Sequence, residues 1–397
     1  MKYIMLVPDG MADYPVPELE GKTPLEVAKI PNMNYFAKHG KVGLVKNIPE
    51  KMEPGSDVAN LSLLGYDPRK HYTGRGPLEA ANMGIKLDEN EVAFRCNFIT
   101  ANEGILADYS GGHIATKESH ELIKALNEKL ESKYIRFFPG VSYRHLLVIR
   151  DSKGFKALSA QCTPPHNITG RPIAEYLPKG PGEETLKKLM FDSRAILEKH
   201  EINHIRLDLK ENPANMIWLW GQGITPRLES FKDKWGMSGS IISAVDLIKG
   251  IGRLIGLTVI DVPGATGYVD TNYEGKASYA LDSLDEKDFV FVHVEAPDEA
   301  GHEGKVKLKI SAIEAFDYHI VGAVRKYCEE NRNAKVLILP DHATPIVKRT
   351  HTSDYVPFIM SGKNIVKDEV EKFSELATKY TTWKVSEGHT LMGSFID

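Results

Sequence analysis

The sequence predicts an α/β protein whose main sheet is largely parallel and lies between helices, with a smaller α/β domain inserted into it. Three short apolar runs support this prediction: Tyr3–Val7, Phe289–Val294 and Lys335–Leu339. Each is followed closely by a turn that contains Pro and Asp. Continuous apolar runs of this length are typical of strands covered on both faces, although His293 interrupts the middle one.

A helical pattern precedes the last of these runs. Its apolar residues recur at spacings of three and four, which places them on one face of a helix. They are Ile310, Ile313, Phe316, Ile320 and Val324. The order of strand, helix and strand indicates parallel α/β architecture, in which ligand sites collect outside the carboxyl ends of the strands.

The middle of the chain has a different sequence pattern from the two ends. It contains an alternating segment at Arg144–Arg150, a helix-like segment at Glu183–His200, and loops rich in Pro and Gly. We therefore predict a core domain formed by residues 1–79 and 232–397, and a second domain at 80–231 that is inserted into it.

Composition excludes several classes of protein. The 50 basic and 54 acidic residues are interspersed and give a net charge of -4, which argues against a nucleic-acid partner. The apolar N-terminal run ends at Pro8, too soon for a signal peptide or a membrane span, so we expect a cytoplasmic protein. The three cysteines are widely spaced and indicate neither disulfides nor a thiolate metal site.

Acidic and histidine residues follow the three predicted strands. Asp9 follows the first, Asp298 and His302 follow the second, and Asp341 and His342 follow the third. The spacing of four between Asp298 and His302 lets both reach one ion if the segment forms a helical turn. Taken singly, each also has a structural explanation as a helix cap, a surface turn or a core histidine.

Together with His351, these residues supply oxygen and imidazole ligands of the kind that binds two divalent cations. Ser56 precedes a predicted helix in Pro54-Gly55-Ser56-Asp57. Two cations can stabilise the attacking and leaving oxygens of a phosphoryl transfer, and coordination makes a serine hydroxyl a better nucleophile. Taken alone, Ser56 is an ordinary loop serine.

The sequence resembles the archaeal-type cofactor-independent phosphoglycerate mutases of the alkaline phosphatase superfamily along essentially the whole chain. The motifs that carry the resemblance are 9–13 (DGMAD), 54–60 (PGSDVAN), 64–68 (LGYDP), 74–80 (GRGPLEA), 298–302 (DEAGH) and 341–342 (DH). The resemblance implies an alkaline-phosphatase-like core and an enzyme that needs no 2,3-bisphosphoglycerate.

The resemblance also implies how two divalent cations are held. Asp9, Ser56, Asp341 and His342 are expected to bind one ion. Asp298, His302 and His351 are expected to bind the other. Manganese is the expected metal, although the same ligands would accept zinc, cobalt or magnesium.

The implied reaction interconverts 3-phosphoglycerate and 2-phosphoglycerate through a phosphoserine at Ser56. An inserted domain that closes over the site would exclude water and retain the glycerate. Both anionic groups of the substrate need cationic partners. The candidate substrate-binding residues are His113, Arg144, Arg171, Lys276 and Arg75.

Other activities on the same centre remain open at this point. A homoserine kinase-like phosphotransferase would use another alcohol as acceptor, and a phosphatase or phosphodiesterase would use the same two cations. The chain has no GxxxxGK[ST] motif, which argues against a P-loop kinase. The residues after Ser56 lack the Pro and Arg of a sulfatase. A scaffold that has lost catalysis is disfavoured because Ser56 and all six other candidate ligands are present.

Overall fold

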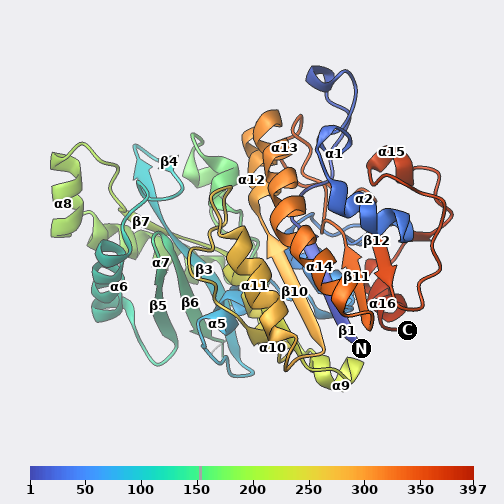
Figure 1. Ribbon diagram of the computed structural model, residues 1–397. Helices are drawn as coiled ribbons and strands as arrows, with labels where there is room; N and C mark the ends of the chain where they lie inside the picture. Colours follow the sequence, from blue (N-terminus) through green and yellow to red (C-terminus); the bar gives the residue numbers. More distant parts are fainter. Residues whose placement is uncertain (152–153) are drawn as a thin grey trace. The chain divides into compact units, whose positions relative to one another are not determined.

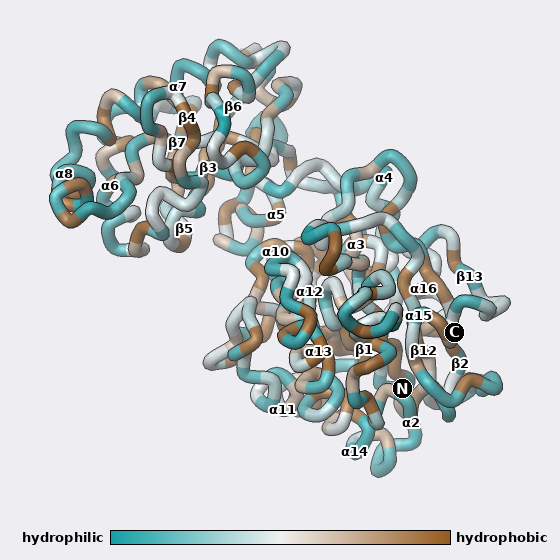
Figure 2. The backbone as a smooth tube through the Cα atoms, turned by 90° about the horizontal axis from the view of Figure 1, so that it is seen from above, coloured by the Kyte–Doolittle hydropathy of each residue, from teal (hydrophilic) through white to brown (hydrophobic). Residues whose placement is uncertain are grey.

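The computed structural model describes residues 1–151 and 154–397, which divide into two compact units (Figure 1). Residues 1–72 and 228–397 form the first unit, and residues 73–227 form the second. Within each unit, hydrophobic segments such as strands β1 and β12 lie inside, and hydrophilic segments lie mainly in loops and on outer helices (Figure 2). None of the helices in the described residues is both long enough and apolar enough to cross a membrane.

The first unit is built on an eight-stranded mixed sheet in the order β13-β2-β12-β11-β1-β10-β8-β9. Its strands are β1 (Lys2–Pro8), β2 (Gly40–Val45), β8 (Gly239–Ile242), β9 (Thr258–Val259), β10 (Phe289–Val294), β11 (Ala334–Ile338), β12 (Val356–Gly362) and β13 (Lys384–Val385). Strands β11, β1, β10, β8 and β9 run parallel, whereas β12 is antiparallel to both of its neighbours. The predicted fold class and the three predicted strands are confirmed.

Helices cover both faces of this sheet. They are α1 (Pro24–Val27), α2 (Pro31–Lys38), α3 (Ser56–Leu63), α4 (Pro68–His71), α9 (Phe231–Trp235), α10 (Asp246–Leu254), α11 (Tyr273–Ser283), α12 (Ala296–Glu303), α13 (Val306–Ala315), α14 (Gly322–Glu330), α15 (Glu375–Thr378) and α16 (Leu391–Ile396). A π-helical turn at Phe316–Val321 joins α13 to α14, so the predicted helical face is continuous.

Because successive side chains of a strand point to opposite faces of the sheet, they contact different helices. Ile4 and Leu6 of β1 share a core cluster with residues of α2, α11, α13 and α14. Tyr3 points to the other face, where its ring meets Phe395 of α16 with centroids 5.5 Å apart. Each such aliphatic or aromatic side chain contributes roughly 1.5–3 kcal/mol when it is fully buried.

The second unit is an antiparallel sheet packed against helices. Its strands are β3 (Glu91–Asn102), β4 (Ile105–Asp108), β5 (Ile135–Val141), β6 (Arg144–Arg150) and β7 (Met216–Gly223). Their order is β4-β3-β6-β5, and β7 also pairs with β3, in antiparallel orientation. Its helices are α5 (Arg75–Asn82), α6 (Thr116–Leu130), α7 (Glu183–Leu197) and α8 (Glu201–Asp208). The alternating and helix-like segments seen in the sequence are strand β6 and helix α7.

A buried polar network ties together the loops that follow β1 and β11. Lys309 of α13 is 0% exposed, and its Nζ donates to Asp13 Oδ2 at 2.7 Å and to the carbonyl of Thr344 at 2.8 Å. Glu375 completes the network by accepting hydrogen bonds from Asp13 N at 3.1 Å and Thr23 Oγ1 at 2.6 Å. The network fixes the relative positions of two loops that carry candidate ligands.

The raised pKa of the Glu375 carboxyl predicts that the protein loses stability as the pH rises. Burial raises the pKa of this carboxyl from 4.5 to about 7, against the hydrogen bond from Thr23. A raised pKa means that the folded state holds the proton more tightly. The stabilisation is therefore complete below pH 4.5 and is lost as the pH approaches 7, by on the order of 1–3 kcal/mol.

We expect Glu375→Gln to reduce the difference in Tm between pH 5 and pH 8, measured by calorimetry. The exposed Glu371 offers a matched control, and Glu371→Gln should retain the full difference. An unchanged pH dependence in Glu375→Gln would contradict this assignment.

Candidate metal centre

Three buried carboxylates meet at the carboxyl edge of the large sheet. Strands β10, β1 and β11 are parallel neighbours, so their carboxyl ends lie side by side. Asp9 directly follows β1, and Asp341 lies in the turn after β11. Asp298 lies in the first turn of α12, which begins just after β10 and favours an acidic residue there. Their exposed fractions are 2%, 0% and 7%, respectively.

Two histidines converge on Asp298. The Nε2 of His302 lies 3.2 Å from Asp298 Oδ2, and the Nε2 of His351 lies 3.4 Å from Oδ1. The two Nε2 atoms are 2.9 Å apart. His302 Nδ1 lies 3.0 Å from the carbonyl of Arg349, which can only accept, so Nδ1 carries a proton and Nε2 is left to face Asp298.

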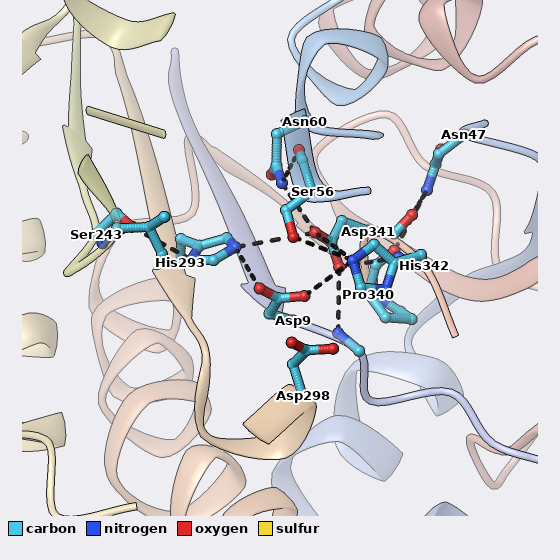
Figure 3. Close-up of polar contacts among 12 residues, drawn as sticks. Asp9, Asn47, Ser56, Asn60, Ser243, His293, Asp298, Pro340, Asp341 and His342 are labelled. Atoms are coloured by element: carbon cyan, nitrogen blue, oxygen red, sulfur yellow. Dashed lines mark hydrogen bonds and ion pairs between the residues drawn. The ribbon is translucent and has the colours of Figure 1, made fainter. Parts of the chain in front are cut away.

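His342 lies beside Ser56 and close to Asp341 and Asp9 (Figure 3). Its Nε2 is 3.1 Å from Ser56 Oγ and 3.4 Å from Asp9 Oδ1. Its Nδ1 is 3.2 Å from Thr344 Oγ1, whose hydroxyl donates to Asp298. Thr344 therefore accepts from His342 Nδ1, and the Nε2 lone pair is free for a ligand. Burial lowers the pKa of His342 to about 4, which keeps the ring neutral at pH 7.

Ser56 is the first residue of α3 and is connected to Asp341 through Asn60. The Asn60 amide donates to the Ser56 carbonyl at 2.8 Å and to Asp341 Oδ2 at 2.9 Å. The other oxygen of Asp341 accepts from the backbone N–H groups of Gly10, at 3.2 Å, and His342, at 2.9 Å. These donors fix the orientation of the Asp341 carboxylate.

The electrostatics of the site fit divalent cations. Burial and the neighbouring charges of Asp341 and Asp298 raise the pKa of Asp9 well above its usual value. Burial alone would also raise the pKa of Asp298, but hydrogen bonds from His302 and His351 bring it well below that value. Cations would offset the repulsion among the buried carboxylates, and the oxygen and imidazole donors suit manganese, zinc or cobalt.

Two groups of donor atoms are compact enough to hold an ion, with all atoms of a group within 4.8 Å of one another. One group is Asp298, His342 and His351, and the other is Asp9, His293 and Asp341. The sequence resemblance instead placed His342 with Asp9 and Asp341, and it did not include His293. His342 Nε2 is 3.6 Å from Asp341 Oδ2, so His342 lies close to both groups.

Lys276 is the one candidate substrate residue in the same unit as these ligands. It lies on α11, is 0% exposed, and its Nζ donates to the carbonyl of His293 at 3.1 Å. Burial lowers its pKa to about 8. The contact holds the carboxyl end of β10 in place.

The residues 73–227 carry the other four candidates. Arg75 and Arg144 lie near a third arginine, Arg95. Burial and the charges of these two arginines lower the pKa of Arg95, whereas the neighbouring Glu79 acts to raise it. Arg75 and Arg95 both lie over the Trp220 ring, at 5.7 and 4.4 Å from its centroid.

His113 and Arg171 make other contacts. His113 has a left-handed backbone with φ of 48° and lines an open pocket with Asp108 and Arg206. Arg171 donates to the Tyr176 hydroxyl at 3.0 Å. Sequence reasoning missed Arg95, although a charged residue inside the apolar strand β3 was a usable signal.

The fold and the site define an α/β protein with a candidate two-cation centre beside a serine. Residues 37–203 match the family model described as 2,3-bisphosphoglycerate-independent phosphoglycerate mutase. A mutase of that name from Methanothrix thermoacetophila is 49% identical over 99% of this chain and 98% of its own. The probable mutase of Geobacter sulfurreducens is 47% identical over the full length of both chains.

Solved structures agree with this relationship. A protein from Pyrococcus horikoshii is similar over 100% of this chain and 96% of its own, with a TM-score of 0.83 and 29% identity. The cofactor-independent phosphoglycerate mutase of Thermoplasma acidophilum gives a TM-score of 0.67 at 28% identity, covering 100% of this chain and 99% of its own. The chain belongs to the 2,3-bisphosphoglycerate-independent phosphoglycerate mutase family and is an enzyme.

A substitution at Gly10 would test how tightly the candidate metal centre is packed. Its φ is +60°, and an added Cβ would lie 2.5 Å from both Asp298 Oδ1 and Thr344 Oγ1. We expect Gly10→Ala to displace Asp298 and to weaken manganese binding roughly tenfold or more, measured by titration of the metal-free protein.

The control is Gly21→Ala. Gly21 also has a positive φ, of +80°, but an added Cβ would meet nothing within 4 Å. This variant shares the backbone strain without the collision, so its metal affinity should remain that of the wild type. Equal losses in the two variants would contradict the packing argument.

Proposed function

We propose that this enzyme interconverts 3-phosphoglycerate and 2-phosphoglycerate through a phosphoserine at Ser56, using two divalent cations. The observation that carries the proposal is the position of Ser56 Oγ, 3.1 Å from His342 Nε2 and beside the buried carboxylates. Membership of the mutase family supports the choice of substrate.

We assign the ligands as Asp9, Ser56, Asp298, His302, Asp341, His342 and His351, with manganese as the expected metal. When bound, the cations would lower the pKa of the Ser56 hydroxyl and offset charge on the transferred phosphoryl group. Ser56 would then be the nucleophile, and the donors to Asp341 described above would hold the adjacent carboxylate in place.

The reaction has two balanced steps. Ser56 Oγ forms a bond to phosphorus while the bond between phosphorus and the substrate oxygen breaks, and the freed glycerate hydroxyl gains the proton that Ser56 gives up. The other glycerate hydroxyl then forms a bond to phosphorus while the bond between phosphorus and Ser56 Oγ breaks, and Ser56 regains the proton that this hydroxyl gives up. Glycerate must stay bound and reorient between the steps, since attack by water would give a phosphatase instead.

The first experiment is an enolase-coupled assay with 3-phosphoglycerate, with manganese or with a chelator. We expect Ser56→Ala to abolish turnover, by roughly 10³-fold or more, because no other hydroxyl replaces the nucleophile. The variant should still fold, as judged by its Tm.

The same assay separates the alternative activities. Release of inorganic phosphate from 3-phosphoglycerate would indicate a phosphatase. Turnover of homoserine with ATP, and none of 3-phosphoglycerate by the manganese-loaded wild type, would contradict the mutase proposal.

The arginine cluster supports binding of an anionic substrate. We propose that Arg75 and Arg144, together with Arg95, bind the carboxylate or phosphate of phosphoglycerate. His113, Arg171 and Lys276 remain further candidates. Arg75 and Arg95 are half-buried and Arg144 is exposed, and like charges held near one another favour an anion between them.

Arg95→Gln should raise the KM for 3-phosphoglycerate roughly tenfold or more, because a charge-assisted hydrogen bond contributes about 1.5–3 kcal/mol. Its matched control is Glu79→Gln. Arg95 Nε pairs with Glu79 at 2.9 Å, so both variants break this ion pair but only the first removes the cation. If both variants raise KM equally, the ion pair is structural and the substrate role is wrong.

A further inference from the structure

We propose that His293 is a further ligand of the cation held by Asp9 and Asp341, with Ser243 positioning its ring. This inference rests on the two-cation site of the proposed function and adds a residue to it. Neither the motifs in the sequence nor the family resemblance assigns a role to His293.

The position of His293 is unusual for a histidine. It lies near the end of β10, the strand between β1 and β8, and all other residues of β10 are Phe or Val. Its side chain is 0% exposed. A buried imidazole without partners on both nitrogens destabilises the fold, so its presence in this strand needs a compensating interaction.

One ring nitrogen has a structural partner. His293 Nδ1 lies 3.3 Å from Ser243 Oγ, and the same oxygen accepts a hydrogen bond from the backbone N–H of Val245 at 3.0 Å (Figure 3). Ser243 follows β8, the neighbouring strand, so the contact is set by the sheet. Metal-binding histidines commonly use such a contact on one nitrogen to orient the other toward the ion.

The other ring nitrogen points into the carboxylate cluster. His293 Nε2 lies 3.2 Å from Asp9 Oδ2 and 3.9 Å from Asp341 Oδ2, but within the described part of the chain it makes no hydrogen bond. Asp9 Oδ1 likewise makes none. The ring is therefore close to Asp9 but is not aligned to donate a hydrogen bond to it. One cation between His293, Asp9 and Asp341 would give both His293 Nε2 and Asp9 Oδ1 a partner.

This ligand has a consequence for metal choice. With His342 Nε2 only 3.4 Å from Asp9 Oδ1, the cation would have two imidazoles near it as well as two carboxylates. Imidazole favours manganese, cobalt or zinc over magnesium, which prefers oxygen ligands. His293 would then be a determinant of metal selectivity as well as affinity.

The test measures metal binding without relying on activity. Metal-free wild type and His293→Asn are titrated with Mn²⁺, and bound ion is counted from the EPR signal of free Mn²⁺. We expect two ions in the wild type, and binding of one of them weakened roughly 10- to 100-fold in the variant. The ratio of Mn²⁺ to Mg²⁺ affinity should fall at that ion. Wild-type affinity for both ions would overturn the proposal.

Two more variants separate a ligand from a packing residue. Ser243→Ala keeps the imidazole and should weaken the same ion by a smaller factor, which tests the role even if His293→Asn fails to fold. His145→Asn is the matched control, since His145 is also buried, at 1% exposure, with a Nε2 that lacks a hydrogen bond. It should bind both ions as the wild type does, and equal weakening in this control would overturn the proposal.

The outcome is distinguishable from failure of the proposed function. The mutase proposal fails if the manganese-loaded wild type does not turn over 3-phosphoglycerate. The ligand proposal fails if manganese affinity is insensitive to His293 and Ser243, whatever the wild type catalyses.

Discussion

Repulsion among three buried carboxylates is the constraint on which the site depends. Asp9, Asp298 and Asp341 are brought together because β10, β1 and β11 are parallel neighbours that end at one edge. In a buried environment such charges require compensation. Imidazoles surround the carboxylates and form candidate cation sites with them, and the donors to Asp341 fix the orientation of its carboxylate. The sheet thus brings the three carboxylates together, and the segments at the carboxyl ends of its strands carry the candidate cation ligands.

The loops can serve this purpose only if they are held rigidly. Lys309 performs this task at a distance from the centre, because one ammonium group binds both the Asp13 side chain and the Thr344 carbonyl. Thr344 in turn contacts both Asp298 and His342 through its hydroxyl. The hydrogen bond from Lys309 to Thr344 therefore connects α13 to Asp298 and His342, two members of one candidate cation group. Lys309 is fully buried and, in the part of the chain that the structure describes, makes no hydrogen bond to a candidate ligand, so we infer that it positions the loops that carry these ligands.

Much of this architecture was predictable from the sequence. Apolar runs that end in Pro and Asp predicted β1, β10 and β11, and parallel topology then predicted that Asp9, Asp298 and Asp341 would meet. The grouping of the candidate donor atoms could not be predicted from local sequence patterns, because it depends on where each side chain points in the folded site. His342 lies near both groups for this reason.

His293 and Arg95 show what sequence patterns conceal. Each is a polar residue among buried apolar residues of a strand, and the sequence alone gives no reason for its presence there. The pairing of the strands supplies the reason, because it places His293 beside Asp9 and Ser243 and places Arg95 beside Trp220. A polar residue inside a buried strand is therefore a stronger functional signal than its local sequence suggests.

The position of Ser56 joins these elements into one chemical arrangement. As the first residue of α3, Ser56 has its side chain at the end of the helix where backbone N–H groups are unpaired and the helix dipole favours negative charge. A phosphoryl group on the proposed phosphoserine would be stabilised there by the helix and by cations at once. His342, whose Nε2 is 3.1 Å from Ser56 Oγ and 3.4 Å from Asp9 Oδ1, connects the serine to the buried carboxylates. In the proposed mechanism, cations would offset the repulsion between a phosphoryl group on Ser56 and the buried carboxylates, so the reaction would depend on the metal.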